Sequence, residues 1–210
     1  MLRFLDSDQL TFSPGVICLG FFDGVHLGHQ AIVNRGKTVA AELNLPLYVH
    51  TYEIPPANVI KHPMAVKEIS PLPEKAALLE RLGVDTVAVS RFDQHMMHMD
   101  GGVFFVHVLL GRLQAKHVVV GYDHRFGFKG STDVKALAEL CREHGVGLSV
   151  VDAVKLPDGR EISSTAIRTA LTRGDIDLAQ RMLGRPVEQA LKDRFSLVNG
   201  EREKVEEGFA

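Results

Sequence analysis

Two histidines stand three residues apart where an apolar run passes into a predicted helix. The stretch ICLGFFDGVHLGHQ (residues 17–30) places His26 and His29 beside Gly24 and Gly28. Imidazoles near the free N–H groups of a helix start suit a phosphate chain, because they can donate hydrogen bonds as negative charge builds up. A zinc pair is a rival use of two such histidines, although no third ligand is evident nearby, and a plain turn is the simplest interpretation.

A second cluster of polar residues precedes another predicted helix. In EISSTAIRTAL (residues 161–171), Ser163, Ser164 and Thr165 stand just ahead of an apolar-periodic segment, with Arg168 one turn inside it. Capping of the helix by a hydroxyl would explain part of this pattern. Three hydroxyls, backbone N–H groups and a guanidinium together indicate a second phosphate site.

A third segment combines aromatic and charged residues among glycines. VVVGYDHRFGFKGSTD (residues 118–133) leaves a strand-like run and then carries Asp123, His124, Arg125 and Phe126. This composition fits contacts to a planar ligand or a nucleotide, and a surface loop with solvated charges is the alternative. In DQHMMHMD (residues 93–100), paired histidines flanked by acids suggest a metal site, but no partner ligand is evident, so we expect a loop there.

The elements that must position these residues alternate between short apolar runs and longer amphipathic stretches. Such alternation predicts an α/β fold, a Rossmann-like parallel sheet with helices on both faces, which binds ligands at the carboxyl ends of its strands. The predicted strands are Val16–Leu19, Leu47–Thr51, Thr86–Val89, His117–Val120 and Leu148–Val151, and the predicted helices cover residues 29–43, 72–82, 102–114 and 133–144.

Composition limits the classes of partner. The 210 residues are 45% hydrophobic and 24% charged with a net charge of −2, which does not favour a nucleic-acid or membrane partner. No apolar run approaches the roughly 20 residues that span a bilayer, and the N-terminus lacks the apolar core of a signal peptide. Cys18 and Cys141 form no CxxC pair, so we expect two buried thiols and a cytoplasmic protein.

With these motifs, the sequence resembles the FMN adenylyltransferase module of prokaryotic FAD synthetases, in the nucleotidyltransferase superfamily that bears the HxGH signature. GFFDGVHLGHQ resembles the first nucleotide motif of that family, VVVGYDHRFG its GxDFRFG loop, and ISSTAIR its ISSTxIR motif. ISPLPEKAALLERLGVD (residues 69–85) resembles its link between the second and third strands. The HxGH signature alone leaves other nucleotidyltransferases open, whereas FDGVHLGHQ combined with GYDHRFG is particular to the flavin branch.

The resemblance implies that ATP and FMN, with Mg²⁺, give FAD and pyrophosphate. It implies catalytic roles for His26, His29 and Arg168, and it gives no protein ligand for the metal. The residues that it implies for ATP binding are Gly20, Phe21, Phe22, Asp23, Gly24, Gly28, Ser163, Ser164 and Thr165. Those that it implies for flavin or nucleotide binding are Tyr52, Asp123, His124, Arg125 and Phe126.

Two segments depart from the family pattern. Where the family usually has a TFxPHP-like sequence, this chain reads HTYEIPPANV (residues 50–59), with Tyr52 as the aromatic and no matching histidine. His124 replaces the usual phenylalanine of the third motif. An adenylyltransferase for another phosphate-bearing acceptor therefore stays open, as does a non-catalytic flavin- or nucleotide-binding module.

The chain also differs from the bifunctional family members in length. Those proteins continue into a riboflavin kinase domain, whereas here only 24 residues follow Pro186. We expect a nucleotidyltransferase domain over residues 1–186 and a short helical or flexible tail over 187–210 with little to bury. We further expect a stand-alone enzyme that receives FMN from a separate riboflavin kinase, and a fragment of a longer protein is the alternative.

Overall fold

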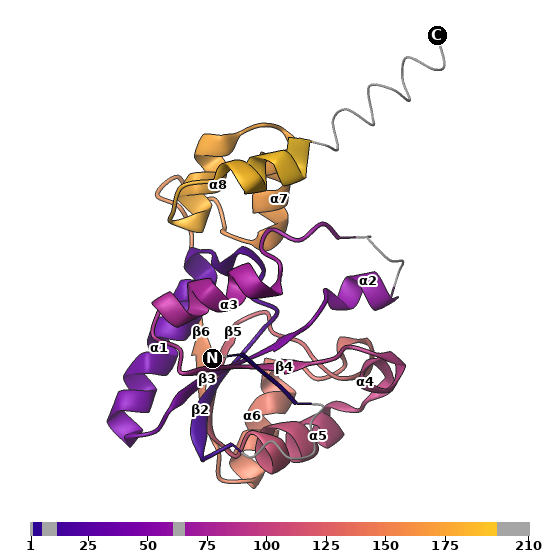
Figure 1. Cartoon of the computed structure of the whole chain (residues 1–210). Helices are drawn as coiled ribbons and strands as arrows, with labels where there is room; N and C mark the ends of the chain where they lie inside the picture. Colours follow the sequence, from indigo (N-terminus) through magenta and orange to yellow (C-terminus); the bar gives the residue numbers. More distant parts are fainter. Residues whose placement is uncertain (1, 6–11, 61–65, 197–210) are drawn as a thin grey trace.

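A six-stranded sheet, with every strand parallel to its neighbours, forms the centre of the computed structural model, which describes residues 2–5, 12–60 and 66–196 (Figure 1). The strand order is β1-β4-β3-β2-β5-β6. The five predicted strands are confirmed, while the three-residue edge strand β1 was not predicted. The strands are β1 (Leu2–Phe4), β2 (Gly15–Leu19), β3 (Leu47–Tyr52), β4 (Thr86–Ser90), β5 (Ala115–Gly121) and β6 (Gly147–Val151).

Helices cover both faces of this sheet, as the sequence predicts. The helices are α1 (Leu27–Leu43), α2 (Pro56–Ile60), α3 (Leu72–Arg81), α4 (Gln94–His98), α5 (Gly101–Phe104), the π-helix η2 (Phe105–Arg112), α6 (Val134–Glu143), α7 (Ser164–Thr172) and α8 (Ile176–Leu183). Single 3₁₀ turns are η1 (Asp23–Val25) and η3 (Phe128–Gly130).

Two segments differ from the sequence prediction. The helix expected over 102–114 is a short α-helix, α5, that continues as the π-helix η2. The expected loop over residues 93–100 instead contains the helix α4, because the carboxylate of Asp93 accepts a hydrogen bond from the N–H of Met96 and caps its start. Among the described residues, no group of three or more His, Cys, Asp or Glu side chains could hold a metal ion there or elsewhere.

The central strand β2 shows why the strand sequences are continuously apolar. Its side chains alternate between two hydrophobic clusters, with Ile17 and Leu19 in one and Val16 and Cys18 in the other. The first cluster packs the sheet against η2 and α6, and the second packs it against α1 and α3. Because both faces are buried, neither set of alternate positions is polar.

The sheet changes its winding direction beside β2. The chain runs from β2 through α1 to β3 on one side, and after β4 it returns to form β5 on the other side of β2. The loops that leave β2 and β5 therefore diverge at adjacent strand ends. This switch point is where open α/β sheets bind ligands.

A third hydrophobic cluster joins α7 and α8 above the sheet (Figure 1). It includes Val187, Leu191 and Phe195, which are buried, and residues 189–196 are helical. The expectation that the segment after Pro186 has little to bury is therefore wrong for its first ten residues, because Val187 is buried before the helix and Leu191 and Phe195 are buried one turn apart within it. The rest of the predicted tail lies outside the described residues.

The two cysteines and the length of the helices bear on where the protein could reside. Cys18 and Cys141 are both free and buried, as the sequence predicts. Within the ranges that the structure describes, no helix combines the length and apolar character required to cross a bilayer.

Candidate active site

The loop after β2 brings His26 and His29 together at the start of α1. His26 is the N-cap residue, and its Nδ1 accepts a hydrogen bond of 3.4 Å from the N–H of His29. The two rings stack with their centroids 3.6 Å apart and their planes at 19°. Both residues line the same cleft. The predicted pairing of the two histidines at a helix entrance is thus confirmed in the fold.

Two glycines of this loop are required for different reasons. Gly24 has φ +80°, and a Cβ there would lie 2.9 Å from Ile69. Gly28 lies against the ring of His26, where a Cβ would come within 3.1 Å of Cε1. The glycines therefore permit the loop conformation and the placement of the His26 ring.

Both histidines are held in the neutral form. Burial, with smaller contributions from the charges of Arg168 and Arg185, lowers the pKa of His26 to about 4. Burial also lowers the pKa of His29 well below its usual value, aided by His26 and Lys75. Each ring at neutral pH therefore offers one N–H donor and carries no charge. Since Nδ1 of His26 accepts a hydrogen bond, we assign its proton to Nε2.

The hydroxyl groups at the start of α7 have different structural roles. Ser163 caps the helix, accepting a hydrogen bond of 3.2 Å from the N–H of Ala166. Ser164 donates a 2.9 Å hydrogen bond to the backbone carbonyl of Asp23, and so joins α7 to the β2 loop. With Thr165, these residues line the same cleft as the histidines. The sequence correctly placed the three hydroxyls near the first motif, and capping accounts for one of them.

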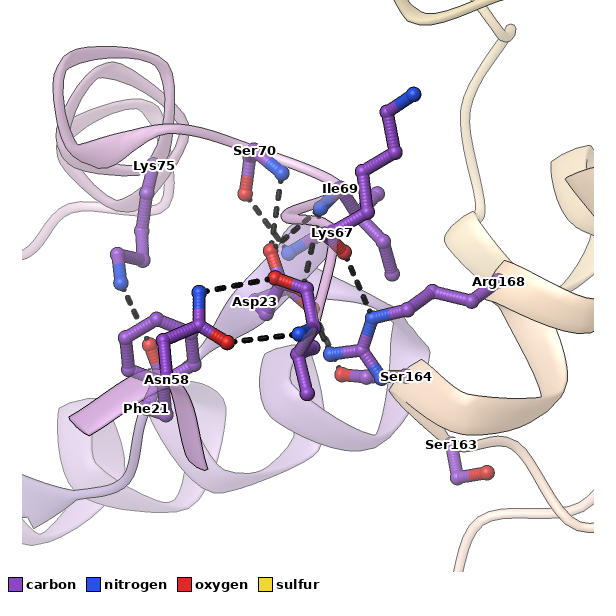
Figure 2. Close-up of polar contacts among 12 residues, drawn as sticks. Phe21, Asp23, Asn58, Lys67, Ile69, Ser70, Lys75, Ser163, Ser164 and Arg168 are labelled. Carbon is purple, nitrogen blue, oxygen red and sulfur yellow. Dashed lines mark hydrogen bonds and ion pairs between the residues drawn. The ribbon is translucent and has the colours of Figure 1, made fainter. Parts of the chain in front are cut away.

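Arg168 points to the β2 loop rather than lining the cleft (Figure 2). Its Nη2 lies 2.9 Å from Oδ2 of Asp23, and its Nε donates a 3.0 Å hydrogen bond to the carbonyl of Lys67. The Asp23 carboxylate is 1% exposed and also accepts hydrogen bonds from the N–H groups of Ile69 and Ser70. Arg168 therefore balances a buried charge that ties three segments together.

The loop after β5 faces the β2 loop across the switch point. His124 N–H donates to the carbonyl of Gly121, which turns the chain, and Phe126 forms an isolated bridge with Thr132. Arg125 donates a 3.2 Å hydrogen bond from Nη1 to the carbonyl of Gly130. These contacts stabilise the third sequence motif as a compact loop.

Two adjoining clefts open at the carboxyl ends of the strands. The first has a volume of about 370 Å³ and is lined by the β2 loop, the start of the β5 loop, residues 151–154 and residues 161–165. The second, of about 320 Å³, is lined by aromatic, methionine and other side chains from β3, α2, the α4 region and the β5 loop. The residues common to both are Leu19, Gly20, Phe21, His124 and Arg125. Ligands in the two clefts would meet along these residues.

Most of the predicted site residues line one or both clefts. In the first are Gly20, Phe21, His26, Gly28, His29, Asp123, His124, Arg125, Ser163, Ser164 and Thr165, and in the second are Gly20, Phe21, Tyr52, His124, Arg125 and Phe126. Four others, Phe22, Asp23, Gly24 and Arg168, line neither cleft. Phe22, Asp23 and Gly24 belong to the β2 loop itself, and Arg168 contacts this loop through Asp23.

Sequence reasoning missed two groups of residues at this site. In the second cleft, His50, Phe92, Met96 and Met99 join the predicted aromatic residues. Both methionines lie in residues 93–100, where the sequence analysis considered only the histidines, as a possible metal site. Lys75 was also missed; it lies within the 69–85 stretch, and its only signal is a lysine on the otherwise apolar face of a short helix.

The family comparison matches this geometry. Residues 8–166 match the model of the FAD synthetase family. The chain belongs to this family. The expectation of family drawn from the three motifs is thereby confirmed.

Relatives in the family are longer proteins. The chain is 35% identical over 183 residues to the bifunctional riboflavin kinase/FMN adenylyltransferase of Listeria monocytogenes, covering 87% of this chain and 57% of the relative. It is 34% identical over 175 residues to the Bacillus subtilis protein of the same name, covering 83% and 54%. The chain therefore spans little more than half the length of these curated relatives.

Solved structures share the fold. A crystal structure described as a macrolide-efflux protein from Streptococcus pneumoniae superposes with a TM-score of 0.76 at 29% identity, covering 84% of this chain and 66% of that one. A pantoate-beta-alanine ligase from Francisella tularensis, described with β,γ-ATP and β-alanine, has a TM-score of 0.55 at 15% identity, covering 85% and 72%. The second likeness concerns the fold alone.

Proposed function

We propose that this chain transfers the AMP group of ATP to the phosphate of FMN, giving FAD and pyrophosphate. The observation that carries this proposal is the meeting of two clefts of different chemistry along Gly20 and Phe21, next to the stacked histidines. The first cleft has the helix start and imidazole donors that suit a triphosphate. The second is lined by Tyr52, Phe92 and Phe126, whose rings suit an isoalloxazine.

The transfer is an in-line displacement at the α-phosphorus of ATP. An oxygen of the FMN phosphate forms a new bond to that phosphorus while the bond to the β-phosphate bridging oxygen breaks, and pyrophosphate leaves with the electron pair. The FMN phosphate is already an anion near neutral pH, so no base is needed to create the nucleophile. The protein contributes positioning and stabilisation of charge.

The neutral histidines supply the stabilising donors in this proposal. His26 and His29 donate N–H groups to the α-phosphate and the leaving pyrophosphate, where negative charge increases in the transition state. The hydroxyls of Ser163 and Thr165 and the free N–H groups at the start of α7 bind the β- and γ-phosphates, while the hydroxyl of Ser164 holds the Asp23 carbonyl in place beside them. Arg168 contributes through Asp23, since its guanidinium already lies against that carboxylate.

Magnesium enters this proposal as part of the substrate. The described residues contain no group of three or more acidic, histidine or cysteine side chains able to hold a metal ion. Mg²⁺ commonly binds through substrate phosphates and keeps most of its waters. We therefore assign it to the triphosphate and give no protein residue as its ligand.

Pyrophosphate release tests the proposal directly. The chain is incubated with ATP and Mg²⁺ and, separately, FMN, riboflavin or nicotinamide mononucleotide, and the products are separated by chromatography. We expect FAD and pyrophosphate with FMN alone. Absence of pyrophosphate with every acceptor would reject catalysis and leave a nucleotide- or flavin-binding module.

A different phosphate-bearing acceptor is the second candidate. It is favoured by His50 and His124, two imidazoles in an otherwise largely apolar second cleft. Turnover with an acceptor other than FMN would support it. FAD formation from FMN at a higher kcat/KM than with any other acceptor would reject it.

The supply of FMN and the location of the reaction complete the proposal. We assign FMN production to a separate riboflavin kinase, and the riboflavin incubation tests this, since FMN or FAD formed from riboflavin and ATP would contradict it. The buried free thiols of Cys18 and Cys141 fit a reducing compartment and support a cytoplasmic location.

A further inference from the structure

The β2 loop adopts a backbone conformation that its sequence does not favour. Phe22 and Val25 have φ of +56° and +43°, next to Gly24 at +80°. Positive φ is uncommon for a large residue and is a genuine outlier for a β-branched one. Such conformations persist where surrounding contacts impose them, and they cluster at functional sites.

Side chains from other elements impose the conformation of this loop. The carbonyl of Phe21 accepts hydrogen bonds from Nζ of Lys75 at 2.8 Å and Oγ1 of Thr51 at 2.9 Å. The carbonyls of the next residues are bound in the same way: Asp23 by Ser164, Gly24 by Arg185 and Val25 by Gln30. Each donor fixes one carbonyl of the strained segment.

Lys75 is unusual among these donors because it is a fully buried cation. Its side chain is 0% exposed, and its Nζ lies 3.7 Å from the centroid of the Phe21 ring (Figure 2). Phe21 lines both clefts, whereas Lys75 lines neither. Burying an ammonium is costly unless hydrogen bonds and opposite charges compensate for the lost water.

The ionisable groups whose charges act on Lys75 or respond to it come from three other segments. The carboxylates of Asp23 and Glu68 favour its ammonium form, and its positive charge in turn disfavours protonation of His29. Burial outweighs the carboxylates and lowers the pKa of Lys75 to about 8. Lys75 therefore acts on both Phe21 and His29 without touching the cleft.

We propose that Lys75 is a positioning residue for the adenylyl transfer, and that its contacts with the carbonyl and the ring of Phe21 fix this residue between the two clefts. This inference rests on the proposed function, since it concerns the geometry of that reaction. Misplacement of reacting groups by about 1 Å can lower a rate about a hundredfold. The ammonium is present below pH 8 and lost above it, so turnover should fall as the pH rises through 8.

Lys75→Met tests the role of the charge, with Thr51→Val as the matched control. Methionine has a similar length and no charge, and Thr51 still donates to the Phe21 carbonyl. Thr51→Val removes that second hydrogen bond, and with it the 3.3 Å bond that Oγ1 of Thr51 accepts from Nζ of Lys75, but it leaves the ammonium bonded to the Phe21 carbonyl. We expect Lys75→Met to lower kcat about a hundredfold and to change the KM for ATP or FMN by less than about threefold. The fall in turnover as the pH rises through 8 should be absent from this variant. Thr51→Val should keep that decline.

Three measurements separate this role from a purely structural one. The melting temperature of Lys75→Met, compared with that of Thr51→Val, shows whether any loss of turnover reflects a loss of fold, because the substitution relieves the desolvation of the ammonium but leaves Asp23 and Glu68 with one fewer counter-charge. Steady-state kinetics from pH 6 to 9.5 gives the profile. NMR of ¹³C-labelled lysine side chains should show one lysine that titrates near pH 8 in the wild type and Thr51→Val and is absent from Lys75→Met.

The outcomes distinguish this inference from the proposed function. Wild-type protein that makes no FAD removes the proposed function itself, whatever the lysine spectra show. Active wild type combined with an unchanged kcat or an unchanged alkaline decline in Lys75→Met overturns the role of Lys75. If Lys75→Met fails to fold, a wild-type profile without a decline near pH 8, or no lysine that titrates there, overturns it equally.

Discussion

The two clefts are built in different ways, although they adjoin at the same switch point. The first is lined by the starts of α1 and α7, whose polar side chains are held by hydrogen bonds to nearby backbone groups. The second is formed by rings and thioethers from segments far apart in the sequence. The first is therefore organised before a ligand arrives, whereas the second owes its shape to side-chain packing.

This difference predicts separate consequences for substitutions. Changes behind the first cleft should act on stability and turnover, because its loops are tied to buried charges. Changes in the second should act on the affinity for the acceptor and leave the use of ATP intact. Four predictions test this division, ordered by the size of the expected effect.

Arg168→Met should produce the largest effect, and on stability. It leaves the carboxylate of Asp23, which is 1% exposed, without its guanidinium partner. Breaking a buried pair in this way costs about 3–5 kcal/mol of unfolding free energy. Urea denaturation measures the loss. Arg173→Met, at an exposed arginine just after the same helix, is the control and should stay within about 0.5 kcal/mol of wild type. Normal stability with a raised KM for ATP would instead assign Arg168 to the phosphates.

His29→Ala should produce the next largest effect, on turnover. Removing one preorganised donor to a developing negative charge lowers kcat by about 10²–10³-fold. Steady-state FAD formation measures it, and circular dichroism checks the fold. His107→Ala, at an exposed histidine of η2 outside both clefts, should retain full turnover. A kcat within about threefold of wild type in His29→Ala would contradict the assigned role.

Lowering the pH should reduce the free energy of unfolding through the buried histidines of both clefts. Burial lowers the pKa of His26 to about 4 and that of His50 to about 3, so the folded protein keeps them neutral below pH 6.5. The unfolded chain binds protons in that range, and the free energy of unfolding therefore falls as the pH decreases from 6.5 to about 4. Each histidine contributes up to about 1.4 kcal/mol per pH unit.

Urea denaturation at pH 4.5, 5.5 and 6.5 measures this dependence, and His50→Gln isolates the second cleft. Glutamine does not titrate and can still bond the hydroxyl of Ser90, which lies 2.9 Å from Nε2 of His50. The free energy of unfolding should change less steeply with pH in His50→Gln than in the wild type. The difference is the contribution of one histidine, up to about 1.4 kcal/mol per pH unit. An unchanged slope would mean that His50 is protonated in the folded protein.

The sequence predicted the backbone of the first cleft well. The strand ends, the helix starts and the hydroxyls of residues 163–165 follow from local patterns, because caps and glycines act within a few residues. The same logic could not find the partner of Arg168, because Asp23 is 145 residues away. Local spacing indicated a phosphate ligand, while the tertiary fold supplied a buried carboxylate.

The second cleft was only partly predictable for a related reason. Tyr52 ends strand β3 and Phe126 lies in the loop after β5, so both could be placed at the sheet edge. Met96 comes from residues 93–100, which were expected to be a loop, and Phe92 directly precedes them; nothing local indicates that this stretch faces a cavity. The edge strand β1 was missed because three residues carry no periodic signal.

Tyr52 offers the finest test of the division between the clefts, because its ring and hydroxyl can be separated. The ring packs edge-on against His50 and Phe92, with centroids 5.3 and 5.0 Å apart, while the hydroxyl has no hydrogen-bond partner among the described residues. Burial raises the pKa of this phenol, so it stays protonated at any pH used for assay. The ring is therefore the expected contributor to acceptor binding.

Tyr52→Ala should raise the KM for FMN about tenfold, in line with the roughly 1.5 kcal/mol of an aromatic contact, and leave the KM for ATP unchanged. Tyr52→Phe keeps the ring and should change either constant by less than about twofold, since it removes a hydroxyl without a protein partner. Steady-state kinetics with each substrate varied in turn measures both variants. A large rise in the KM for FMN in Tyr52→Phe would show that the hydroxyl bonds the acceptor. The second cleft would then select its ligand by hydrogen bonding as well as by packing. The two clefts would still differ in what maintains their shape, which is hydrogen-bonded loops in the first and side-chain packing in the second.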